Sequence, residues 1–198
     1  MVDALTQRHR AQQLLLRRAT VQGVERAWPA LNWTRIDDTY PALAAQVGRL
    51  VELNRRTSAG LAAGYLREFR RAQGVGGAAK IDLAKPLIVD QFNASLSTTS
   101  VAALKAAAAQ GTPADVALAN ALTLAQGAMA RLVLNAGRET LVQSLAADSR
   151  ARGYRRILGG GGCDFCQMLA GRGGVYSADT ADFAAHDHCG CTAEPVFG

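Results

Sequence analysis

Apolar residues recur every three or four positions along the N-terminal part of the chain. Residues 2–28 predict a helix with Val24 and Trp28 on its apolar side, and Pro29 interrupts the pattern. A helix with one apolar side must bury that side against another element. The sequence therefore predicts an N-terminal helix that packs against a neighbouring helix.

A second and longer apolar repeat runs from about residue 39 to residue 73. Thr39 is of the type that caps helix N-termini, and Gly74 stands where glycine commonly ends a helix. The polar positions between the apolar ones are largely arginines, such as Arg55 and Arg67. The apolar side is formed by Leu43, Val47, Leu50, Leu61, Tyr65 and Phe69. We expect the two helices to form an antiparallel hairpin.

The pattern is less regular over residues 78–98. It predicts an extended crossover with one short strand around residues 87–89, followed by a helix from Thr99 or Ser100 to Gly111. These residues therefore connect the hairpin to a further helical region.

A clear helix start follows. Thr112 is the predicted N-cap, Pro113 the first helical residue, and Asp115 the carboxylate that reaches back in a capping box. The helical pattern then continues through the rest of this region. It forms one helix or two helices separated near Gly127 or Gly137.

The character of the sequence changes after Arg150. Three short stretches, GYRRIL, GGVYS and CTAEPVF, predict short strands. The last ~45 residues bury too little apolar surface to fold alone, so we expect an additional stabilising element among them.

The composition is that of a folded, helix-rich protein. Apolar residues make up 49% of the 198 residues and charged residues 19%. No run approaches the ~18 consecutive apolar residues of a membrane-spanning helix, and the N-terminus lacks the order of a signal peptide. We expect no membrane partner and synthesis in the cytoplasm, where thiols stay reduced.

The charge is unevenly distributed. Residues 1–73 carry the whole net charge of +6, and all of their basic residues are arginines. A basic helical arm can face nucleic acid or an acidic protein surface, or it can be a solvated helix face. Aromatic residues are not interleaved with the arginines, so stacking on single-stranded nucleic acid is not supported.

All four cysteines and two of the three histidines lie between Cys163 and Cys191. A Cys-x-x-Cys turn directs two thiolates to one side, and His186 and Cys189 repeat that spacing. The preferred zinc ligands are Cys163, Cys166, His186 and Cys189. Cys191 competes for the fourth place, and a site of four cysteines is also possible. His188 is the weakest candidate, since its side chain should point away from Cys189.

Two other roles of clustered cysteines compete with zinc. Disulfides require oxidising surroundings, and a thioredoxin-like redox motif requires a Cys-x-x-Cys in a βαβ setting. A catalytic zinc would keep an open position beside a general base, yet neither a His-Glu-x-x-His motif nor a deaminase signature is present. We therefore expect a structural Zn²⁺ ion, no enzyme activity and no small-molecule substrate.

Together these patterns predict a mainly α protein of the α+β class. Residues 1–77 form a basic helical arm and residues 78–150 a helical core region. Residues 151–198 form a small, β-rich Cys/His module that zinc stabilises.

The Cys/His residues and their flanking strands follow a recognisable order: an aromatic and basic strand, Cys-x-x-Cys, a Leu-x-Gly turn, His-x-x-Cys-x-Cys and a proline-containing strand. The corresponding positions are Tyr154–Ile157, Cys163, Cys166, Leu169–Gly171, His186, Cys189, Cys191 and Pro195. This order resembles the C-terminal signature of the phage Mu F-like minor head proteins (the head morphogenesis family), most closely those of tailed phages of actinobacteria. Many relatives have proline after the histidine, where this chain has Asp187 and His188, so the fourth ligand stays open.

The resemblance implies a low-copy, structural minor capsid protein. It would contact the phage portal protein at the portal vertex inside the virion head, and would occupy the host cytoplasm during assembly. Its role would lie in head assembly, DNA packaging or ejection, with packaged DNA and other inner head proteins as further partners. The residues alone also allow a zinc-containing, nucleic-acid-binding accessory protein.

Overall fold

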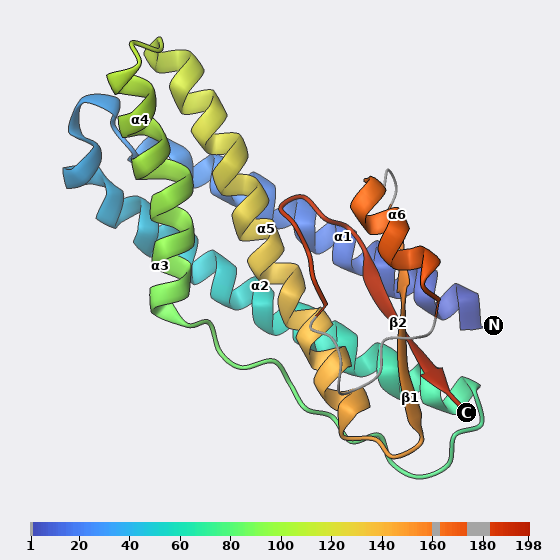
Figure 1. Ribbon diagram of the computed structural model, residues 1–198. Coiled ribbons are helices and arrows are strands. Elements are labelled where there is room, and N and C mark those ends of the chain that lie inside the picture. The colour runs from blue at the N-terminus through green and yellow to red at the C-terminus, as the bar shows by residue number, and fades with distance from the viewer. Residues whose placement is uncertain (1, 160–162, 174–182) are drawn as a thin grey trace.

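The computed structural model describes residues 2–159, 163–173 and 183–198. Three long helices form its body; shorter helices cover one end, and a small sheet with a helix covers the other (Figure 1). The long helices are α1 (Val2–Ala27), α2 (Ile36–Ala72) and α5 (Ala114–Ala146).

The helices α1 and α2 form the antiparallel hairpin that the apolar pattern predicts (Figure 1). Two short 3-10 turns, Trp28–Ala30 and Trp33–Arg35, connect them. The end of α2 is also as predicted. Gly74 adopts a φ of +67°, and the N–H of Val75 donates to the carbonyl of Arg70 at 3.0 Å, which is the Schellman arrangement.

The predicted N-cap of α2 is wrong. The helix begins at Ile36, and Thr39 lies inside its first turn, where its hydroxyl donates to the carbonyl of Arg35 at 2.7 Å. The same hydroxyl accepts the N–H of Asn32 at 3.0 Å and so fixes the preceding turn to the helix. A first-turn threonine can bond its own helix as readily as it can cap one, and sequence does not separate the two cases.

The crossover between α2 and the next helix is extended, but the predicted strand at residues 87–89 is wrong. No strand is assigned over residues 75–88, and a helix begins at Val89, ten residues earlier than expected. Helix α3 (Val89–Ser97), a π-helical turn (Thr98–Ala102) and α4 (Ala103–Ala109) follow one another without a break.

Side chains of the bundle, rather than a neighbouring strand, bind the backbone of the crossover. The N–H of Asp82 donates to the hydroxyl of Ser144 at 2.9 Å, and that of Ala84 donates to Thr140 at 3.0 Å. Hydroxyl groups on α5 thus replace the sheet partner that an extended segment usually requires. The segment lies along α5 and closes the bundle.

The start of α5 differs from the predicted capping box. Pro113 occupies the N-cap position without a side-chain cap bond, and the helix begins at Ala114. Thr112 and Asp115 therefore do not cap it reciprocally. The N–H of Thr112 instead donates to the carbonyl of Ala107 at 3.0 Å and completes the end of α4.

A single helix runs through both glycines at which a break was considered. A Cβ on Gly137 would lie 2.8 Å from Ser58 Oγ and 2.9 Å from Gln13 Nε2, and a Cβ on Gly127 would collide with the ring of His188. The glycines are therefore places where other elements approach α5 closely, rather than helix ends.

The C-terminal residues form an antiparallel two-stranded sheet and one helix. Strand β1 (Ala151–Ile157) pairs with β2 (Thr192–Phe197), with Tyr154 opposite Pro195, and α6 (Asp164–Gly171) lies between them in sequence. The predicted mainly α fold with a small β-containing module is confirmed. The third predicted strand, GGVYS, falls almost entirely outside the described residues.

The buried side chains form two clusters. The first lies among α1, α2, α3, α4 and α5 and contains no residue after Val133. The second joins the two regions: Phe69 of α2 and Leu141 of α5 pack with Tyr154, Leu169 and Ala193 of the C-terminal module. The module therefore shares its core with one end of the helical bundle.

Helix α5 is long and apolar enough to cross a membrane by length and composition alone. An 18-residue window of it has a mean hydropathy of 1.3, although polar residues and alanines interrupt its strongly apolar positions. Half of this window is buried inside the protein, against α1 and α2. A buried core helix passes the same test, so the hydropathy is weak evidence for a membrane span.

A buried polar network connects α1 and α2 to β2. The hydroxyl of Thr6 donates to the carboxylate of Glu194 at 2.5 Å and lies 2.8 Å from the hydroxyl of Tyr65. His9 stacks on Tyr65, with ring centroids 4.4 Å apart, and its buried Nδ1 has no hydrogen-bond partner in the described part of the chain. Burial lowers the pKa of His9 from 6.5 to about 4.

Acid should destabilise the protein through His9. Because the folded state binds the proton more weakly than the unfolded state, stability present above pH 6.5 is lost as the pH falls towards 4, by about 3 kcal/mol. Chemical denaturation at several pH values measures this slope. In His9→Phe, which keeps a ring on Tyr65, the extra slope should vanish; an unchanged slope would contradict the assignment.

Candidate metal centre

The first two predicted ligands lie at the start of α6. Cys163 occupies the N-cap position and is exposed, whereas Cys166 lies in the first turn and is buried. A spacing of three residues places both thiols on one side of the helix. The N–H of Gln167 donates to the carbonyl of Cys163 at 2.9 Å and so fixes this turn.

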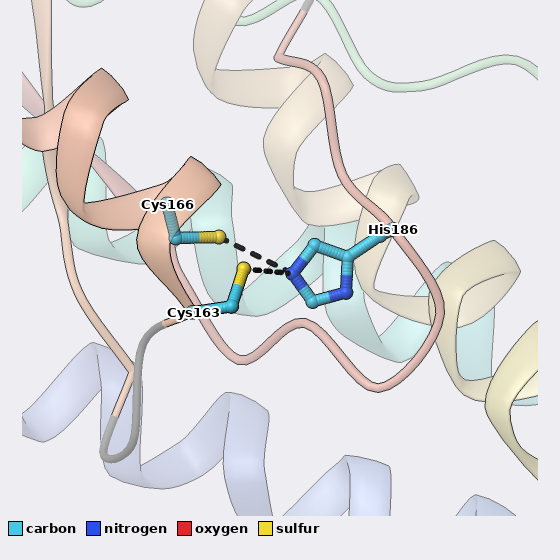
Figure 2. Close-up of side chains that lie close together, drawn as sticks. All are labelled: Cys163, Cys166 and His186. Atoms are coloured by element: carbon cyan, nitrogen blue, oxygen red, sulfur yellow. Dashed lines mark hydrogen bonds between the residues drawn. The ribbon is translucent and has the colours of Figure 1, made fainter.

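His186 faces both thiols. Its Nε2 lies 3.2 Å from the Sγ of Cys163 and 3.3 Å from the Sγ of Cys166 (Figure 2). Its Nδ1 lies 2.6 Å from the carbonyl of Asp187, and a carbonyl only accepts, so Nδ1 carries the proton. Nε2 is then free to donate its lone pair to a metal ion. The same bond to Asp187 raises the pKa of His186.

Two sets of three possible ligands meet at Cys166. The first is Cys163, Cys166 and His186; the second is Cys166, Cys189 and Cys191; within each set the ligand atoms lie within 4.8 Å of one another. The Sγ atoms of Cys166 and Cys189 are 3.8 Å apart. Sulfurs bound to one tetrahedral zinc at ~2.3 Å lie about 3.8 Å apart, so this edge already fits a metal site.

The structure thus gathers all five predicted ligands, but not as one closed set of four. Only Cys166 belongs to both groups of three, so a single ion held by four of these residues would require the two groups to move together. Cys189 and Cys191 belong to the second group alone, and both stay candidates for the fourth ligand. All four cysteines are free, and the Cys166–Cys189 separation is well beyond the bonded length of about 2.05 Å.

His188 lies away from these groups. Its backbone has a φ of +62°, and its ring lies against Gly127 of α5. The side chain fills the space that the missing Cβ of that glycine leaves. His188 therefore contributes to packing of the module on the bundle.

The thiols of Cys189 and Cys191 interact and shift each other's pKa in opposite directions. The Cys189 thiol donates to Cys191, which lowers the pKa of Cys191 to about 6 and raises that of Cys189 to about 12. A backbone hydrogen bond from Cys166 also lowers the pKa of the exposed Cys163. Metal ligands must be deprotonated, so the cluster already favours two of its thiolates.

Two supporting residues escaped the sequence analysis. The N–H of Gly159 lies 3.5 Å from the Sγ of Cys191, and its Cα approaches the backbone of Gly190 too closely to allow a Cβ. Arg138 of α5 donates to the carbonyl of Cys189 at 2.8 Å and to that of Cys191 at 3.0 Å. An arginine within the apolar α5 was the available signal for the second of these.

The described residues define a helical-bundle protein with a C-terminal Cys/His cluster that can bind a metal ion. The model of the VG15 protein family matches residues 1–198, and the chain belongs to this family of phage proteins. No curated protein and no solved structure gives a significant match.

Proposed function

We propose that the cluster holds one structural Zn²⁺ ion. The donors are thiolates and an imidazole, which zinc prefers, and the Cys166–Cys189 separation of 3.8 Å has the length of a tetrahedral S–S edge. His186 directs its Nε2 at the two thiols of α6, and the flanking strands β1 and β2 hold the ligands in place. Four ligands from the chain would fill the coordination sphere and leave no open position for catalysis.

We further propose that the protein is a minor head protein of a tailed phage, associated with the portal vertex inside the capsid. The observation that carries this proposal is the gathering, within a member of a phage protein family, of all five Cys/His positions of the Mu F-like signature. The C-terminal module packs against one end of the helical bundle. Its strands β1 and β2 include Tyr154–Ile157 and Pro195, the positions that the signature gives to strands.

Some of the arginines in α1 and α2 are buried, so fewer of them are available to contact a partner than the sequence suggests. Arg55 is buried and donates to the carbonyl of Leu132 at 2.6 Å, and the buried Arg70 pairs with Asp148. Both arginines therefore hold the fold together rather than contact DNA. The exposed arginines of α1 and α2 are Arg8, Arg18, Arg26, Arg49, Arg56, Arg67 and Arg71. They supply the surface that we propose for the portal protein or packaged DNA.

Mass spectrometry of purified virions tests the head-protein proposal. We expect the protein at low copy number in virions, and retained in empty heads that keep their portal. Its absence from virions, with normal amounts in infected cells, would contradict the proposal.

The exposed arginines also support the second candidate, a nucleic-acid-binding accessory protein. In that case duplex binding should weaken steeply as salt rises, because phosphate contacts release counterions. Reversing two exposed charges, Arg67→Glu with Arg71→Glu, should then reduce the affinity for DNA, while Arg35→Glu at the opposite end of α2 should not.

A further inference from the structure

Two buried arginines lie together beside the cysteine cluster. Arg138 of α5 and Arg156 of β1 are each 4% exposed, and both guanidinium groups lie over the ring of Phe183, at 5.1 and 3.8 Å from its centroid. Arg138 binds the carbonyls of Cys189 and Cys191. Arg156 pairs across the sheet with Ala193, two residues after Cys191.

These positive charges have no acidic partner among the described residues. Neither arginine takes part in a carboxylate ion pair there, although arginines stay charged at any physiological pH. Among the described residues, Arg156 donates one bond, to the carbonyl of Ala184 at 2.6 Å, and its buried Nε and Nη1 have no partner. A buried, unpaired charge is costly, and two like charges side by side cost more.

A metal–thiolate cluster would supply the missing negative charge. Zinc with three cysteinates and one histidine carries a single net negative charge, and zinc with four cysteinates carries two. Guanidinium N–H groups near such a cluster stabilise it through the electrostatic field and through N–H···S hydrogen bonds.

We propose that Arg138 and Arg156 are the counter-cations of the metal–thiolate cluster. This inference rests on the metal site proposed above. Arg138 acts also as a positioning residue, because it fixes the backbone that carries two ligands. Arg156 acts through charge and through its two free donors.

Charge compensation and a packing role predict opposite effects of losing Arg156 on the stability of the metal-free protein. With metal bound, loss of Arg156 removes a favourable interaction. Without metal, loss of Arg156 removes a buried charge that no carboxylate of the described residues balances. Arg156→Met should therefore weaken metal binding while leaving the metal-free protein as stable as before, or more stable.

The test uses the reduced, full-length protein, stripped of metal and titrated with Zn²⁺ and with Co²⁺ against a competing chelator. We expect Arg156→Met to lower the affinity about tenfold or more, and Arg156→Lys, which keeps the charge, to remain within about threefold of the wild type. Arg152→Met, an exposed change on the same strand, is the matched control and should bind as the wild type does.

Thermal melts of the metal-free proteins complete the test. An unchanged affinity of Arg156→Met, or an equal loss in Arg156→Lys, would overturn the inference. So would a metal-free Arg156→Met that melts well below the wild type, because that result indicates packing. A wild-type protein that binds no metal would overturn the zinc proposal itself, and this inference with it.

Discussion

Replacing Cys166 by serine should abolish tight metal binding and loosen the C-terminal module. Cys166 is the one ligand that belongs to both groups of three, and it is 1% exposed in the core shared with Phe69 and Leu141. The affinity for metal should fall by more than the ~10–100-fold that is lost when a residue that only hydrogen-bonds to a metal ligand is removed. Because metal binding contributes folding free energy to a small module, chelation of the wild type should have the same effect.

Limited proteolysis measures the outcome. After EDTA treatment or in Cys166→Ser, trypsin should cleave within β1, at Arg152 or Arg155, while the first core cluster keeps most of the helical signal in circular dichroism. Met168→Ser, an exposed change on the same helix, should cleave as the wild type does. Equal protection of β1 with and without chelator would show that the module does not depend on metal.

Replacing Gly159 by alanine should also disrupt the cluster, by steric means alone. The new Cβ would lie 2.6 Å from the carbonyl carbon of Gly190 and 2.7 Å from its oxygen, and both are backbone atoms that cannot rotate away. The end of β1 would have to separate from the turn that carries Cys189 and Cys191, and the N–H bond to Cys191 would lengthen. We expect a loss of about 3 kcal/mol in the free energy of unfolding.

Denaturant titration of the metal-bound protein measures this loss, and chelator competition measures the accompanying drop in affinity. Gly171→Ala is the matched control, because a Cβ at that position meets nothing within 4 Å. Comparable stability of the two variants would contradict the close approach of Gly159 to Gly190.

The long helices could be predicted because their apolar spacing matches the helical period over many turns. The same method failed where tertiary contacts decide the conformation. The extended crossover is bound by the hydroxyls of Thr140 and Ser144, which are distant in sequence. Gly127 and Gly137 resemble helix breaks in sequence, yet the structure uses their missing side chains for contact with His188 and Ser58.

The members of the Cys/His cluster could be named from sequence because cysteine and histidine at short, repeated spacing have few other uses. The division of these residues into two groups of three could not be predicted, because it depends on the distance between α6 and the turn before β2. Arg138 and Arg156 were out of reach for a different reason. Their proposed role comes from burial without an acidic partner among the described residues, and burial of a charge is a property of the folded chain.

The bond between Thr6 and Glu194 has a consequence for biosynthesis. It joins residues 188 positions apart, so α1 leaves the ribosome long before its buried partner on β2 exists. At a translation rate of ~5–20 residues per second, ~10 s or more pass between the synthesis of α1 and that of β2. During that time the end of the core that β2 covers is exposed. A ribosome that stalls before β2 would release a chain whose exposed apolar surface marks it for proteases.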